Sequence, residues 1–153
     1  MGREIRRVPK GWQHPKDDYG DYIPMYDRDY PTASAEWKKN FALWEAHAHP
    51  HYNPDYEYWE WENAPDPDTC RPAFEGDPTC YQIYETVSEG TPTSPVFETE
   101  AEIAAWLVAQ GYSEKAATNF VKSAWAPSFM FMPSTGLVDG VAAMEFDDDK
   151  GKE

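Results

Sequence analysis

Residues 80–125 decide the fold, and they read CYQIYETVSEGTPTSPVFETEAEIAAWLVAQGYSEKAATNFVKSAW. The stretch opens with 80–87, where β-branched and aromatic residues dominate, and Pro78 and Gly90 bound this run. Such a composition between turn residues predicts a strand over 80–87. The loop that follows is rich in proline, and we expect 96–97 to form a brief second strand.

Two helices complete the stretch. Thr99 and Glu102 match the Thr-x-x-Glu capping box that marks a helix start. Gly111 suits the left-handed residue that ends a helix, and Ser113 can cap the next one. The short connection between them predicts an αα-hairpin over 99–125.

A further helix is expected over 34–48, with Thr32 or Ser34 as its cap. Its aromatic residues recur at spacings of four and three and form one stripe, made of Trp37, Phe41 and Trp44. A stripe of this kind is typical of a helix that packs through one face.

The last elements are short. Residues 129–132 predict an apolar strand, 134–136 a turn, and 137–144 a returning strand that Gly140 interrupts. Together these patterns predict an α+β fold, in which about three helices pack on a small, mainly antiparallel sheet and long proline-rich loops join the elements.

The charge divides the chain unevenly. Residues 1–16 carry a balance of +4 and residues 17–153 a balance of −19, which gives the formal −15. We expect an extended basic, proline-rich arm over 1–31, packed on the body. One globular domain is expected over 32–146 and a solvated acidic tail over 147–153.

The arm is expected to contact the body through basic and aromatic side chains. Basic residues near so many carboxylates are expected to pair with the protein's own acidic surface, although exposed pairs of this kind contribute little stability. The expected contact residues are Arg3, Arg6, Arg7 and Trp12.

Residues 50–79 are the least regular part of the chain. Within them, residues 55–68 interleave rings with carboxylates, and we name this stretch the acidic aromatic segment. The imperfect alternation over 56–62 is compatible with a short edge strand, whereas the prolines beyond it favour a loop. The expected interaction residues are Asp55, Glu57, Tyr58, Trp59, Glu60, Trp61, Glu62, Asp66 and Asp68.

Three histidines form the densest chemical cluster: His47, His49 and His51. They are a weak candidate for a zinc site with Cys70 and Cys80, because nine residues separate the two cysteines and structural zinc pairs are closer. The simpler interpretation is a helix C-terminus that carries imidazoles. The cysteines are either free thiols, as expected in a cytosolic protein, or a disulfide.

No motif of catalysis is evident, so the sequence predicts neither catalytic residues nor a cofactor. The second helix of the hairpin carries only Lys115 and Lys122 as basic residues, whereas a helix that reads DNA needs a basic footprint. The negative charge also opposes direct binding to nucleic acid or anionic lipid, and no apolar run reaches the length of a membrane span.

Four stretches carry a resemblance. They are REIRRVP at 3–9, WQHPK at 12–16, the stretch 81–107, which includes YETVSEGTPTSPVFET at 84–99, and AWAPS at 124–128. Together they resemble blocks in small uncharacterised proteins encoded by tailed bacteriophages, with Ala124 where those proteins have glycine. The resemblance covers about a third of the chain. It implies phage origin and a host-cell cytoplasmic setting, but no mechanism.

These observations favour a non-catalytic binding protein. We expect the acidic, ring-rich surface to dock on a basic groove of a host nucleic-acid-binding or defence protein, as an inhibitor of the anti-CRISPR or antirestriction kind or a DNA mimic. One alternative is a minor virion or assembly protein that uses residues 1–31. Another is a metal-dependent enzyme or zinc-stapled domain that uses His47, His49 and His51. The oligomeric state stays open.

Overall fold

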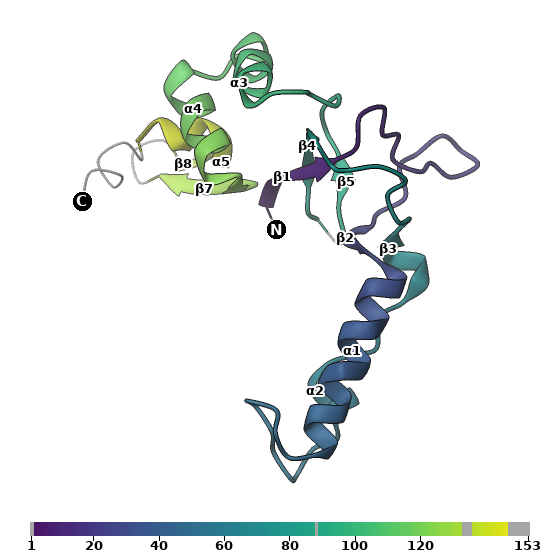
Figure 1. The fold of residues 1–153 in the computed structure, drawn as a ribbon. Helices are drawn as coiled ribbons and strands as arrows, with labels where there is room; N and C mark the ends of the chain where they lie inside the picture. Colours follow the sequence, from purple (N-terminus) through teal and green to yellow (C-terminus); the bar gives the residue numbers. More distant parts are fainter. Residues whose placement is uncertain (1, 88, 133–135, 147–153) are drawn as a thin grey trace. The chain divides into compact units, whose positions relative to one another are not determined.

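The computed structural model describes residues 2–87, 89–132 and 136–146 (Figure 1). These residues form helices and strands in mixed order, which confirms the expected α+β class. The chain divides into two compact units. Unit 1 comprises Met1–Pro24 with Phe74–Glu153, and unit 2 comprises Met25–Ala73.

Unit 1 contains a four-stranded antiparallel sheet with the order β5-β4-β1-β6. Its strands are β1 (Gly2–Val8), β4 (Cys80–Glu85), β5 (Thr91–Pro92) and β6 (Trp125–Pro127). The strand predicted over 80–87 is confirmed as β4. In place of a second strand at 96–97, Phe97 forms a single bridge with Tyr81.

The predicted αα-hairpin is confirmed as α3 (Glu100–Ala109) and α4 (Glu114–Ser123), which lie side by side in Figure 1. The Thr99 hydroxyl accepts a hydrogen bond from the Glu102 amide at 3.2 Å, which is the first bond of the expected capping box. The Glu102 carboxylate accepts from the Glu98 amide at 2.9 Å, so the return bond goes to Glu98 and not to Thr99. Gly111 turns the chain between the helices with a φ of +107°, a value that favours glycine.

The core of unit 1 lies where this hairpin meets the sheet. Ile103 and Leu107 of α3 and Phe120 of α4 are almost wholly buried, and they pack with Ile83 of β4 and Ala126 of β6. Burial of such apolar surface is the main favourable contribution to folding. The hairpin therefore packs on the sheet through Ile103, Leu107 and Phe120.

The C-terminal elements are β7 (Phe129–Met132), β8 (Gly136–Asp139), α5 (Gly140–Ala143) and a 3₁₀ turn at Met144–Phe146. The strand predicted over 137–144 is wrong beyond Asp139, because the Asp139 carboxylate accepts hydrogen bonds from the Val141 and Ala142 amides and starts a helix. Residues 134–135 of the predicted turn and the predicted tail 147–153 lie outside the described residues.

Unit 2 consists of α1 (Tyr30–Glu45), α2 (Tyr58–Trp61), a 3₁₀ turn at Pro67–Thr69, and the parallel strands β2 (Tyr26–Asp29) and β3 (Cys70–Arg71). The helix predicted over 34–48 begins earlier than expected. Its cap is Asp29, whose carboxylate accepts from the Thr32 amide at 2.9 Å. Pro31 lies in the first turn of α1, where its missing N–H is not needed.

Neither a strand nor a loop forms at the centre of the acidic aromatic segment, contrary to both sequence interpretations of 56–62. Residues Tyr58–Trp61 form the single turn α2. The Glu57 side chain accepts from the Glu60 backbone, and the Glu60 carboxylate accepts from the Glu57 amide at 2.8 Å. This reciprocal capping box stabilises a helical turn, although the alternation of rings and acids in the sequence is typical of a strand.

The boundaries between the two units follow Pro24 and Ala73, whereas the sequence analysis placed the boundary between arm and domain after residue 31. The reason is long-range pairing, since β1 belongs to the same sheet as β4. Cys70 and Cys80 are both buried free thiols. No helix in the described part of the chain combines the length and apolar character that a membrane span requires.

The approach of α5 to β6 gives a test of this packing. A Cβ atom on Gly140 would overlap the carbonyl oxygen of Pro127 and lie 2.6 Å from its carbonyl carbon. We therefore expect Gly140→Ala to lower the free energy of unfolding by about 1–3 kcal/mol in urea denaturation, because backbone atoms must move apart.

Gly76→Ala is the matched control, since a Cβ at Gly76 meets nothing within 4 Å. The control should change the unfolding free energy by less than about 0.5 kcal/mol. Equal effects of the two substitutions would contradict the close approach of α5 and β6.

Candidate functional site

The acidic aromatic segment is held on α1 by buried rings. Tyr58 has 0% of its surface exposed, and its ring lies 5.3 Å from Trp37 and 5.7 Å from Trp44, measured between centroids. The indole N–H of Trp44 donates to the Tyr56 carbonyl at 3.1 Å, and that of Trp37 donates to the Glu62 carbonyl at 3.0 Å. The predicted stripe on α1 therefore fixes the backbone of the segment at both ends of α2.

Three other rings of the segment face solvent. Tyr56, Trp59 and Trp61 are 56%, 53% and 52% exposed. Trp59 stacks on Phe41 with centroids 6.4 Å apart, and Trp61 stacks on His51 at 5.0 Å. One side of each stacked indole is thus supported while half of its surface stays open. Tyr58, by contrast, was expected to contact a partner, and its burial makes it a supporting residue.

Most carboxylates of the segment accept hydrogen bonds from neighbouring residues of the segment. Glu57 and Glu60 form the capping box of α2, and Asp66 accepts from the Asp68 amide at 2.9 Å. The Tyr58 hydroxyl donates to Glu62 at 2.9 Å. Burial, together with this bond, raises the pKa of Tyr58 to about 12. The carboxylates therefore fix the segment, and all six, including Asp55 and Asp68, belong to exposed residues.

The three histidines lie among rings. His47 stacks on Tyr52 with centroids 4.3 Å apart, and His49 lies 5.4 Å from Trp44. The centroids of His49 and His51 are 5.9 Å apart. Within the described ranges, no group of three or more His, Cys, Asp or Glu residues is arranged to hold a metal ion. The positions of these imidazoles thus fit ring packing.

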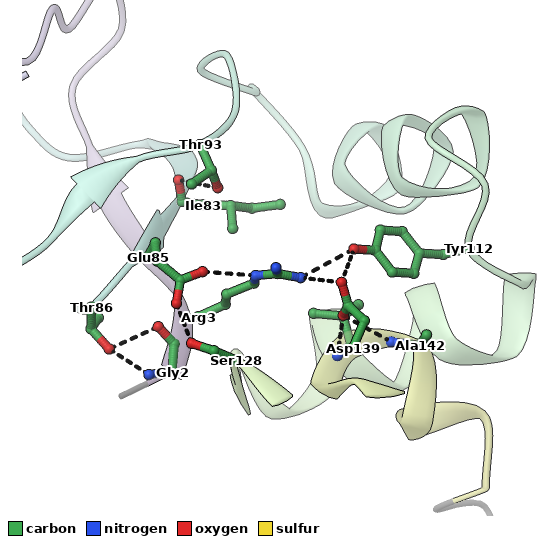
Figure 2. A network of polar contacts seen from close by, with 11 residues as sticks. Gly2, Arg3, Ile83, Glu85, Thr86, Thr93, Tyr112, Ser128, Asp139 and Ala142 are labelled. Carbon is green, nitrogen blue, oxygen red and sulfur yellow. Dashed lines mark hydrogen bonds and ion pairs between the residues drawn. The ribbon is translucent and has the colours of Figure 1, made fainter. Parts of the chain in front are cut away.

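In unit 1, the arm residue Arg3 lies at the centre of a polar network (Figure 2). Its Nε donates to Glu85 at 2.9 Å, and its Nη1 donates to Asp139 at 2.7 Å and to the Tyr112 hydroxyl at 3.1 Å. Tyr112 in turn donates to Asp139 at 2.8 Å, and Ser128 donates to Glu85. The network joins β1, β4, the hairpin and the start of α5.

The electrostatics of this network favour its charged form. Burial opposes the charge of Arg3, but the hydrogen bonds to Asp139 and Glu85 outweigh it and raise the pKa of the guanidinium. Burial likewise acts against ionisation of Asp139, and the bond from Arg3 nevertheless lowers the pKa of that carboxyl. These groups are paired with one another, so removal of one partner would leave the others without the group that balances them.

Arg6 and Arg7, which follow Arg3 on β1, make their contacts within unit 1. Arg6 is 4% exposed, donates to Glu4 at 2.7 Å, and lies 4.1 Å from the centroid of the Tyr84 ring. Arg7 is exposed and lies 4.5 Å from the Tyr81 ring. Their contacts are cation–π interactions as well as an ion pair.

Trp12 lines an open cleft of about 840 Å³ in unit 1. Its indole N–H donates to the Tyr84 hydroxyl at 3.1 Å, and that hydroxyl lies 3.0 Å from Nδ1 of His14. Nε2 of His14 lies 2.7 Å from the Ile23 carbonyl, which can only accept. Nε2 therefore carries the proton, and Nδ1 accepts from Tyr84. Burial lowers the pKa of His14, so this neutral tautomer is favoured.

Gln82 of β4 lines the same cleft and is 6% exposed. Its Nε2 donates to the Ser94 carbonyl at 2.8 Å. Its Oε1 is buried and has no hydrogen-bond partner among the residues that the structure describes. A buried acceptor left in this state costs about 1–3 kcal/mol, and a ligand donor would offset this cost once the Gln82 side chain turns towards the cleft.

Sequence reasoning missed both groupings in unit 1. Glu85, Tyr112 and Asp139 looked like ordinary polar residues, and His14 and Gln82 belong to segments far apart in sequence. A weak signal was present, because Gln82 is a polar residue between the apolar and aromatic residues of the strand predicted over 80–87. Comparison of the chain with protein-family models, curated proteins and solved structures found no match.

The Arg3 network gives a stability prediction. We expect Arg3→Met to lower the free energy of unfolding by about 1–3 kcal/mol in urea denaturation, because it leaves Glu85 and Asp139 without their charged donor. Arg7→Met removes the same charge from an exposed position on the same strand and should cost less than about 1 kcal/mol. A larger loss for Arg7 than for Arg3 would contradict the network.

His14 gives a pH prediction. Its pKa is lowered from the ordinary 6.5, so the unfolded chain binds more protons than the folded chain once the pH falls through 6.5. Stability is therefore lost as the pH falls from 7 towards 5, and the loss levels off below the folded-state pKa. His14→Gln should reduce this slope in urea midpoints. An unchanged slope in the His14 variant would refute the assignment.

Proposed function

We propose that this protein is a non-catalytic binding protein that docks its acidic aromatic segment on a basic surface of a protein partner. One observation carries the proposal. Residues 55–68 contain six carboxylates and no lysine or arginine, and three rings among them are about half exposed. Exposed Trp and Tyr in an acidic setting are suited to an interface, because such rings anchor complexes and charges steer the encounter.

The support beneath the segment strengthens the argument. Tyr58 and the α1 rings pack below α2, while Trp59 and Trp61 each stack on a neighbour. Side chains held in this way lose little conformational freedom on binding, which favours affinity. The capping box similarly fixes Glu57 and Glu60 before a partner arrives. The surface is therefore prepared for a partner of complementary charge.

The resemblance to phage proteins suggests the class of protein to which the partner belongs. A protein made during infection meets host proteins in the cytoplasm, and basic grooves are characteristic of proteins that hold nucleic acid. We therefore propose a host nucleic-acid-binding or defence protein as the partner and inhibition as the outcome, with DNA mimicry as one form of it. A role as a minor virion component is distinguished by mass spectrometry of purified particles.

Affinity capture from a bacterial lysate at low and high salt, followed by binding kinetics with the purified partner, tests the proposal. We expect basic partners that are released at about 0.5 M salt, where exposed charges are screened. Trp59→Ala should weaken binding by about 2 kcal/mol, or roughly thirtyfold, if this ring is an anchor. The double variant Asp55→Asn/Asp68→Asn should slow association several-fold at low salt, because it weakens steering.

The controls place the same changes in unit 1. Tyr19→Ala removes a ring that is 91% exposed, and Asp18→Asn/Glu75→Gln removes two charges at exposed positions. Both controls should retain wild-type binding. A partner that binds all four variants equally, or that stays bound unchanged in high salt, would refute docking through the acidic aromatic segment.

A further inference from the structure

The cleft beside His14 differs in chemistry from the rest of the protein. It measures about 840 Å³, which is within the range of about 300–1,000 Å³ typical of small-molecule sites. Although the chain carries a net charge of −15, no aspartate or glutamate is among the described residues that line it, and Lys16 is. The wall next to Lys16 belongs to the basic part of the chain. An anionic ligand is therefore tolerated here.

Gln82, which lines the cleft, carries a buried oxygen that lacks a donor within the part of the chain that the structure describes. The orientation of the Gln82 amide is fixed, because the Ser94 carbonyl accepts from Nε2 and could not accept from Oε1. Oε1 is therefore the atom without a partner among the described residues. A ligand that satisfies it must bring an N–H or O–H group. This requirement argues against a proline-rich peptide, whose prolines have no N–H.

Rings form the walls next to Gln82. His14 lies edge-on to Trp12 and to Tyr22, with centroids 6.3 Å and 5.7 Å apart. The indole N–H of Trp12 already donates to Tyr84, and both nitrogens of His14 are engaged. These side chains therefore offer ring surface rather than free donors, and ring surface favours a flat, aromatic ligand.

The positive charge lies beside the same rings. Nζ of Lys16 is 4.9 Å from the centroid of Tyr22, and the side chain is exposed. The nearest carboxylate in sequence, Asp17, is occupied by its own turn, since it accepts from the Tyr19 and Asp21 amides at 2.9 and 3.0 Å. An ammonium group in this position can contact a phosphate at the mouth of the cleft.

We infer that this cleft is a nucleotide site: the base lies against Trp12 and Tyr22 and donates an N–H to Oε1 of Gln82, while its phosphate contacts Lys16. The ligand class follows from these three requirements together, which are a flat ring, a donor edge and an anionic group. The site is independent of the proposed protein interface, because every residue that carries it belongs to unit 1.

Isothermal titration of the full chain with AMP, GMP, CMP and UMP, and with adenosine and inorganic phosphate alone, tests the inference. At least one nucleotide should bind, and phosphate alone should bind far more weakly. Gln82→Met should weaken nucleotide binding about tenfold, because the base loses its acceptor. Lys16→Met should weaken AMP several-fold and leave adenosine unchanged, because only AMP carries the phosphate.

Lys122→Met is the control, since it removes an exposed lysine from α4, and it should bind nucleotides as the wild type does. If Gln82→Met fails to fold, the exposed Lys16 variant and the comparison of AMP with adenosine still decide the case. Absence of binding by all four nucleotides overturns the inference. So does equal affinity for phosphate alone, or an effect of Lys16→Met on adenosine as large as on AMP.

Discussion

β1 lies between β4 and β6, and its hydrogen bonds join the first residues of the chain to strands that come much later. Arg3 stands opposite Glu85, and Val8 stands opposite Cys80. Without this pairing β4 would keep only the short strand β5 as a neighbour, and the αα-hairpin would lose part of the surface it packs on. The ends of unit 1 are thus held together by one central strand.

The same pairing decides where the positive charges go. It places Arg3 between Glu85, Tyr112 and Asp139, and it buries Arg6 against Glu4 and the Tyr84 ring. Guanidinium groups keep their charge when partly buried, so they suit such positions better than lysine does. The acidic character of the protein comes from its composition of 28 aspartates and glutamates against 13 lysines and arginines, and the internal pairs of Arg3 and Arg6 with Glu85, Asp139 and Glu4 do not change this balance.

The aromatic residues have two separate uses. In unit 2, Tyr58 and Trp44 are buried and support the backbone, whereas Trp59 and Trp61 rest on neighbouring rings and keep half of their surface open. In unit 1, Trp12 and Tyr22 line a cleft rather than a convex surface. Rings can thus support a backbone in one unit and line a cleft in the other, since each ring contributes much area with few rotatable bonds.

The sequence by itself determined what depends on local patterns: the strand at Cys80–Glu85, the hairpin of α3 and α4 with its caps, and the ring stripe of α1. It misplaced α2 and the start of α1, because a four-residue turn leaves little periodicity and Asp29 lay outside the expected cap. Only the tertiary structure decided that Tyr58 is buried, that Arg3 meets Asp139, and that His14 and Gln82 share a cleft. The physical reason is sequence separation, since contacts between distant segments depend on strand pairing and packing, which no local pattern encodes.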